Sequence, residues 1–280
     1  MRWRAGIALI GLLLLMPISA RAAEEPKNKG LFITPVRSYQ NVSPGHSTGG
    51  TFTVANITTQ PADIDLSVQQ FSVSDYNYDY QFSQIRDNWI HLSKTRLTLK
   101  PQKSETITYS VTAPADAAPG GHYFTLFATT KLEQNPNKVQ AATTLYVTVD
   151  GTLSRTSHIN STTIPVISFG TAIDFSLDVK NTGNTHYFVY TSGSLAGLSA
   201  SNEKPESTSL LLPGKSRVVR GTIPAPILPG VYPAVYGFKV DDGQIVEHKQ
   251  LVIYIPPWSA LLPIGIILLV QTIRRYRTKR

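Results

Sequence analysis

The chain of 280 residues contains no cysteine, so no disulfide can stabilise it and its fold must depend on the burial of apolar side chains. Helical periodicity is also missing, except at the two ends of the chain. Short runs rich in Val, Ile, Thr, Tyr and Phe follow one another instead, and Pro and Gly separate them. This pattern predicts an all-β protein built from immunoglobulin-like β-sandwiches.

The body of the chain has no excess of charge of either sign. The formal net charge is +8, but three of the 26 Lys and Arg residues lie near the N-terminus and five lie in the last seven positions. The remaining 18 basic residues equal the 18 Asp and Glu residues in number. A neutral body has no basic surface to hold a phosphate backbone, so we do not expect nucleic acid as a partner.

Patterns that carry chemistry are missing as well. None of the six histidines stands four residues from another in the H-E-x-x-H manner of a zinc site, and no G-x-S-x-G motif is present. The carboxylates form no evident pair for acid and base catalysis. We therefore predict that the protein is not an enzyme and has no metal site and no cofactor.

The N-terminus has the three parts of a secretory signal peptide. Arg2 and Arg4 supply positive charge, Ala5 to Met16 are apolar, and Ala20 and Ala22 fit a cleavage site of the A-x-A kind. We expect residues 1–22 to be removed and the body of the protein to be exported.

The C-terminus predicts a membrane anchor. An apolar run follows Pro256 and Pro257 and stops at Arg274 and Arg275, and Trp258 suits the outer membrane interface. The run before the prolines, LVIYI, has the composition of a final core strand. We predict a transmembrane helix over 257–273 and a basic cytoplasmic tail over 274–280, which gives a single-pass protein of the cell membrane with its body outside.

One pattern occurs twice and predicts two domains. LKPQKS at Leu99 is repeated as LLPGKS at Leu211, and in each copy a strand, a proline and a Pro-Gly turn follow. Upstream, VANIT at Val54 is repeated as VKNTG at Val179. We place two tandem sandwiches at 23–150 and 151–256, with the boundary near Gly151.

The segment SDYNYDYQF alternates acidic or amide side chains with tyrosines. In a strand this would put three oxygen ligands on one face and an aromatic ladder on the other. A calcium loop is one alternative, although Tyr80 stands where glycine is needed and Arg86 where glutamate is needed. The tyrosines could bind sugar rings or a partner, or pack between two sheets. The candidate ligand-binding residues are Tyr76, Tyr78, Tyr80, Trp89, His122 and Tyr123; for His122 the alternative is a structural hydrogen bond to a backbone carbonyl.

Several stretches resemble one family of Gram-positive cell-surface proteins. GLFITPV, TFTVANIT, NWIHLSKTRLTLKPQKSETITYSVTAP and APGGHYFTLFATT are similar to the WxL-interacting proteins. The resemblance covers roughly residues 30–149 and implies an N-terminal domain that binds peptidoglycan, a second sandwich, one C-terminal helix and a basic tail. The second domain does not match the family's host-binding domain.

Together these observations predict a membrane-anchored, extracellular binding protein of the bacterial cell envelope. Its partner would be cell-wall peptidoglycan, another exported protein, or both. The alternative is a structural spacer or a chaperone-like assembly module, reminiscent of pilus chaperones, that binds no glycan.

Overall fold

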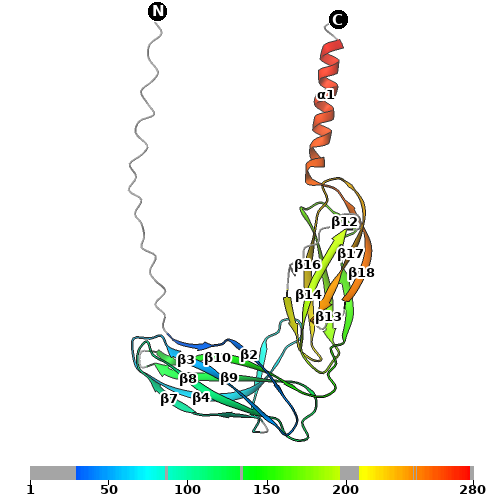
Figure 1. The fold of residues 1–280 in the computed structure, drawn as a ribbon. Coiled ribbons are helices and arrows are strands. Elements are labelled where there is room, and N and C mark those ends of the chain that lie inside the picture. Colours follow the sequence, from blue (N-terminus) through cyan, green and yellow to red (C-terminus); the bar gives the residue numbers. More distant parts are fainter. Residues whose placement is uncertain are drawn as a thin grey trace, which may run out of the picture.

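A computed structural model describes residues 30–85, 88–132, 135–195, 208–241, 243 and 245–277. It contains two β-sandwiches in tandem, followed by one C-terminal helix (Figure 1). The predicted fold class, all-β with two immunoglobulin-like sandwiches and an apolar C-terminal helix, is confirmed. The predicted signal peptide, residues 1–22, lies outside the described residues, as do residues 278–280 of the predicted tail.

The first sandwich has two sheets that face each other across a buried apolar core. One sheet has the order β1-β3-β8-β6, and the other has the order β2-β10-β9-β4-β5, with β7 also paired to β4. The strands are β1 (Leu31–Thr34), β2 (Arg37–Val42), β3 (Ser47–Asn56), β4 (Ala62–Val73), β5 (Tyr80–Ser83), β6 (Ile90–Leu92), β7 (Arg96–Leu99), β8 (Ser104–Thr112), β9 (Gly120–Leu132) and β10 (Asn135–Val149).

The second sandwich repeats this plan with fewer strands. One sheet has the order β11-β13-β16, and the other has the order β12-β18-β17-β14-β15. The strands are β11 (Ser157–Thr163), β12 (Ile167–Ser168), β13 (Ala172–Asn181), β14 (Tyr187–Leu195), β15 (Thr208–Leu211), β16 (Ser216–Pro224), β17 (Gly230–Val240) and β18 (Ile245–Tyr254). The segment that joins the two sandwiches, between β10 and β11, contains Gly151.

In each sandwich the first strand belongs to one sheet and the second strand belongs to the other. β1 runs antiparallel to β3, and the chain then crosses so that β2 runs parallel to β10. β11 and β12 do the same with β13 and β18. Period-two alternation decides which residues face inward: in β13, Ile173, Phe175, Leu177 and Val179 are buried, and the residues between them are half-buried or exposed.

A buried asparagine explains the repeated sequence pattern. Asn56 and Asn181 are both fully buried at the ends of β3 and β13. In each, the side-chain oxygen accepts a hydrogen bond from the amide two residues later, at 3.0 Å from Thr58 and 2.8 Å from Gly183. In each, Nδ2 donates to the leucine carbonyl that precedes the Pro-x-Lys-Ser turn, at 3.0 Å to Leu99 and 3.1 Å to Leu211.

The two asparagines therefore hold the Pro-x-Lys-Ser turns in place by hydrogen bonds. The residue after each proline has a positive φ, 57° at Gln102 and 73° at Gly214. Glycine adopts this conformation without steric cost, so the second copy has the less strained turn.

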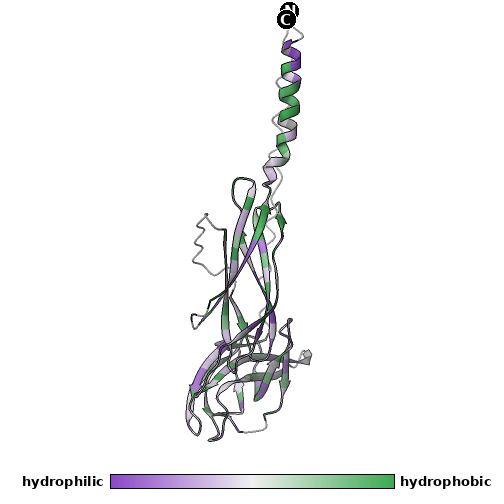
Figure 2. Cartoon of the chain, turned by 90° about the vertical axis from the view of Figure 1, so that its right-hand side faces the viewer, coloured by the Kyte–Doolittle hydropathy of each residue, from purple (hydrophilic) through white to green (hydrophobic). Residues whose placement is uncertain are grey.

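The C-terminal helix begins at Pro257 with a 3₁₀ turn, η1 (Pro257–Leu261), and continues as α1 (Leu262–Arg277). It extends past the predicted end at Ile273, so Arg274 and Arg275 lie in its last turn. Residues Pro257–Arg275 are long and apolar enough to cross a membrane, with a mean hydropathy of 1.4, and none of this stretch is buried against the sandwiches. Figure 2 shows the apolar length of the helix and its polar C-terminal end.

We expect Asn56→Ala and Asn181→Ala each to lower the free energy of unfolding by about 2 to 4 kcal/mol, because buried backbone groups lose their partners. Thermal or denaturant unfolding of the detergent-solubilised chain measures the loss. The control is Asn41→Ala, at an exposed position on β2. Equal stability of all three variants would contradict the structural role of the buried asparagines.

Candidate functional site at the junction of the two sandwiches

The two sandwiches meet in an apolar cluster, which we call the junction cluster. On the first sandwich it uses the outer face of the larger sheet, whose inner face fills the core. The buried members are Phe71, Val73, Tyr123, Tyr146, Leu210 and Leu212, and Tyr78 and Phe188 pack against them. Phe71, Tyr123 and Tyr146, which face outward from this sheet, are therefore covered by the second sandwich rather than by solvent.

The tyrosine-rich segment is a loop at this junction, and the strand that the alternation suggested begins only at Tyr80. Ser74 to Asp79 connect β4 to β5, and Tyr76 and Tyr78 have φ values of 62° and 58°. Such values are uncommon for residues other than glycine and are incompatible with a strand. They turn the tyrosines toward the second sandwich instead of sorting them onto one face of a sheet.

This β4–β5 loop is hydrogen-bonded to the start of β16. The Ser216 amide donates to the Asp75 carboxylate at 2.8 Å, and the Tyr76 amide donates to the Ser216 carbonyl at 2.9 Å. The Tyr76 hydroxyl donates to the Asp178 carboxylate at 3.1 Å. The loop thus contacts the Pro-Gly-Lys-Ser turn of the second copy of the repeat.

Tyr78 makes a further contact in the same place. Its hydroxyl accepts a hydrogen bond from the Leu212 amide at 3.3 Å, and the guanidinium of Arg217 lies 4.5 Å from the centre of its ring. A cation over an aromatic face is attracted to it, more strongly where water is partly excluded. Burial raises the pKa of the Tyr78 hydroxyl, so this group stays protonated.

A loop of the second sandwich makes the reciprocal contact. The main-chain carbonyl of Asn184 accepts a hydrogen bond from the Gly121 amide at 2.9 Å, and the side-chain Nδ2 of Asn184 donates to the Pro119 carbonyl at 3.1 Å. Gly120 has a φ of 135°, and a Cβ there would lie 2.4 Å from the Asn184 oxygen. The Pro-Gly-Gly turn is therefore a docking surface that tolerates no side chain at Gly120.

His186 is enclosed by tyrosines beside this contact. Its ring lies 5.2 Å from that of Tyr146, 5.6 Å from that of Tyr123 and 5.8 Å from that of Tyr39. The Tyr123 hydroxyl is 3.4 Å from Nδ1. Burial, helped by the positive charges of Arg155 and Arg37, lowers the pKa of His186 to about 4. The histidine is thus neutral at physiological pH.

The six predicted ligand-binding residues lie in different surroundings. Trp89 is buried in the core of the first sandwich and stacks on His122 at 4.4 Å, and His122 Nε2 is 3.2 Å from the Ala118 carbonyl, which is the structural alternative considered above. Tyr123 is buried at the junction and Tyr78 is half-buried there. Tyr76 and Tyr80 keep about half of their surface exposed, 51% and 46%. Ligand binding by any of the six stays a prediction.

An aromatic surface remains open beside the junction, and we call it the open aromatic row. Tyr80 and Phe82 on β5 are stacked at 6.0 Å, with their planes 8° apart, and each is 46% exposed. Phe82 also rests edge-on against buried Phe127 at 5.0 Å. Across the sheet, Tyr39 on β2 is 46% exposed and contacts Tyr146 at 5.3 Å. The row consists of Tyr80 and Phe82, because Tyr39 lies at the opposite edge of the sheet and contacts His186 and Phe188 at the junction.

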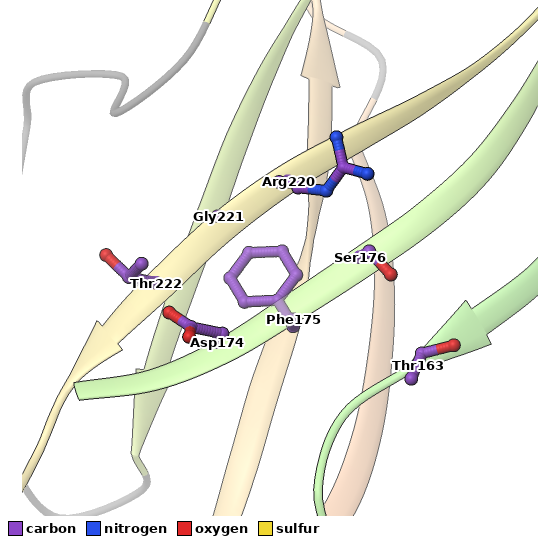
Figure 3. A pocket seen from close by; sticks show the side chains of 7 residues that line it. All are labelled: Thr163, Asp174, Phe175, Ser176, Arg220, Gly221 and Thr222. Atoms are coloured by element: carbon purple, nitrogen blue, oxygen red, sulfur yellow. The ribbon is translucent and has the colours of Figure 1, made fainter. Parts of the chain in front are cut away.

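A shallow hollow of about 680 Å³ lies on the second sandwich, over the paired strands β13 and β16 (Figure 3). A Cβ at Gly221 would lie 2.4 Å from Cζ of Phe175, so the missing side chain makes room for the phenylalanine ring. Asp174 and Arg220 line the hollow, together with the hydroxyl side chains of Thr163, Ser176 and Thr222. The feature is explained by packing.

Within the described residues, no group of three or more His, Asp or Glu side chains could hold a metal ion.

No family model and no curated protein matches the chain. Among solved structures it is similar to the E. coli chaperone DraB, with 14% identity and a TM-score of 0.40 over 79% of this chain and 96% of that chain. It is also similar to the Salmonella enterica SafA pilin in complex with the SafB chaperone (12%, 0.38, 82% and 98%) and to a PapD-like domain of human CEP192 (12%, 0.35, 53% and 99%).

Sequence identities and TM-scores this low do not indicate a function. The fold class is assigned from the strand topology of the chain itself. These neighbours are a PapD-like domain, a chaperone and a complex of a chaperone with a pilin, and none of the three is a WxL-interacting protein. The finer resemblance to the WxL-interacting family stays a prediction from the quoted residues.

We expect the double variant Asp75→Ala, Tyr78→Ala to loosen the junction, because the loop loses its carboxylate acceptor and its ring contact with Arg217. Spin labels on cysteines introduced at exposed Thr106 and Lys180 report the distance between the sandwiches, and the chain has no other cysteine. The distance distribution should broaden in the double variant but not in Asn77→Ala, a matched change in the same loop. An unchanged distribution in the double variant would contradict the role of the loop.

The lowered pKa of His186 predicts that docking of the sandwiches weakens in acid. Above pH 6.5 the histidine is neutral in both docked and undocked states, so docking is independent of its charge. Between pH 6.5 and about 4 only the undocked histidine takes up a proton, and docking loses up to about 3 kcal/mol as the pH falls. The same spin-label distances, measured against pH, should show less acid loosening in His186→Phe, because the carboxylates titrate in both proteins. An identical pH profile would rule the histidine out.

Proposed function

We propose that the chain is a membrane-tethered, chaperone-like or scaffolding module that binds a segment of another exported protein at the open aromatic row. The observation that carries this proposal is the exposure of Tyr80 and Phe82 on an edge strand beside a fixed junction. Exposed aromatic side chains that are already ordered lose little conformational freedom on binding and are enriched at protein interfaces.

The edge of β5 gives the surface a second means of binding. β5 pairs with β4 over Tyr80 to Ser83, and no other described strand pairs with it. All four residues of β5 are exposed. An extended peptide can add to such an edge through main-chain hydrogen bonds, while its apolar side chains contact the aromatic rings.

A protein partner fits these contacts better than a glycan does. Sugar binding needs free aromatic faces, but Trp89, Tyr123 and Tyr78 use theirs in the core or at the junction. The resemblance to the WxL-interacting proteins implies cell-wall peptidoglycan, which we keep as the second candidate because Tyr80 and Phe82 still have exposed surface.

The proposed location is the cell membrane. The helix Pro257–Arg275 is apolar and is not buried against the rest of the chain, and Arg274, Arg275 and Arg277 end it. Positive residues at one end of an apolar helix favour the cytoplasmic side, so both sandwiches would lie outside the cell.

The test replaces Tyr80 and Phe82 and changes no buried member of the junction cluster. A photo-crosslinking amino acid at Gln81, on the free edge strand β5, should capture an exported protein in the membranes of the source cell. Tyr80→Ser with Phe82→Ser should reduce the yield at least about tenfold, since burying two aromatic side chains is worth several kcal/mol. The matched control is Phe32→Ser, an exposed aromatic residue of the other sheet.

Two outcomes would contradict the protein-binding proposal. One is crosslinking that is unaffected by the double variant. The other is co-sedimentation of the full chain with purified cell wall that depends on Tyr80 and Phe82, without a crosslinked protein, which would favour the glycan candidate.

A further inference from the structure

One end of the second sandwich carries a group of exposed apolar side chains, which we call the apolar collar. They come from the loop and strand before β13, the loop between β16 and β17, and the paired ends of β17 and β18. The members are Val166, Ile167, Phe169, Ile227, Leu228, Val231, Leu251 and Ile253. Ile227 is 82% exposed, Leu228 64% and Phe169 61%. An exposed apolar patch of this kind marks a surface that is covered in use.

The collar surrounds the point at which the helix leaves the sandwich. β18 ends at Tyr254 and η1 begins at Pro257, so two residues connect them. Two extended residues span about 7 Å. Trp258 Nε1 donates a hydrogen bond to the Ile227 carbonyl at 3.1 Å. This bond connects the first turn of the helix to the most exposed loop of the collar. Figures 1 and 2 show the helix emerging from this end.

Polarity changes along β18 with distance from the helix. The outward-facing residues nearest the helix are Ile253 and Leu251, and the next two along the same face are Lys249 and Glu247. Ile253 lies directly beside Val231 on one neighbouring strand and Ile167 on the other. The apolar surface is therefore a band that ends where the charged residues begin.

We propose that the apolar collar inserts into the boundary between the lipid headgroups and acyl chains of the membrane that the helix spans. This inference rests on the membrane anchoring proposed above. If the helix crosses the membrane, the short connection leaves no room for a folded partner between the collar and the lipid surface. Apolar loops next to an interfacial tryptophan suit this depth, and the charged residues farther along β18 would lie in the aqueous phase.

The consequence is a fixed orientation. The second sandwich stands on the membrane by its collar as well as by the helix, and the first sandwich lies across its far end (Figure 1). Because the junction holds the two sandwiches together, the open aromatic row is presented at a defined height above the lipid surface.

The experiment uses the full chain in vesicles of phosphatidylcholine and phosphatidylglycerol. Leu228→Cys carries an environment-sensitive fluorophore, and Glu247→Cys, on the exposed face of β18 beyond the collar, is the matched control. A third label at Ile266→Cys reports the helix. We expect the label at position 228 to emit at shorter wavelength, to be quenched by lipids spin-labelled near the headgroup, and to be at least about fivefold less quenched by aqueous iodide than the label at 247.

The outcomes separate the two proposals. Iodide quenching at 266 equal to that at 247 would overturn the anchoring and the collar together. Protection at 266 with full iodide quenching at 228 would overturn the collar alone. Protection at 228 that disappears when the protein is diluted in excess lipid would show that a second copy covers the surface, which also contradicts insertion into lipid. Phe169→Cys provides an independent position with the same expected result.

Discussion

The contact between the two sandwiches fixes how the first is held relative to the second. It is made from both sides: the β4–β5 loop of the first sandwich contacts the turn before β16, and the Asn184 loop of the second contacts the Pro-Gly-Gly turn. Between these polar contacts lies the apolar junction cluster. Because hydrogen bonds are directional and the cluster is buried, the two sandwiches are expected to behave as one body rather than as domains on a flexible linker.

The duplicated sequence has acquired different uses in its two copies. In both sandwiches a buried asparagine holds the Pro-x-Lys-Ser turn against the end of a strand. Only the second turn is also hydrogen-bonded to the β4–β5 loop, through the Ser216 amide. Likewise, the Pro-Gly turn of the first copy docks on Asn184, whereas Pro229 and Gly230 of the second copy lie at the end with the apolar collar. One turn thus connects the sandwiches and its counterpart lies next to the proposed membrane surface.

Much of the fold could be predicted from the sequence, because period-two alternation and proline or glycine punctuation are local signals. The repeat also pointed to Asn56 and Asn181, although their burial depends on partners that lie far away along the chain. The site was harder to predict. Alternation in SDYNYDYQF imitates a strand, and nothing local shows that Tyr76 and Tyr78 adopt positive φ. Tyr39, Tyr146 and His186 come together only through strand register and domain docking, so no spacing in the sequence could have grouped them.

Hydrogen exchange at the amides that cross the junction measures whether the two sandwiches move as one body. The amides of Tyr76, Gly121 and Ser216 donate to acceptors in the other sandwich. If the sandwiches are held together, all three amides, although they lie in or beside turns, are protected to a similar degree as amides in the central strands, since they exchange only when the sandwiches separate. Exchange at the rate of exposed loop amides, with the strands of both sandwiches still protected, would show that the two sandwiches move independently and would contradict the account.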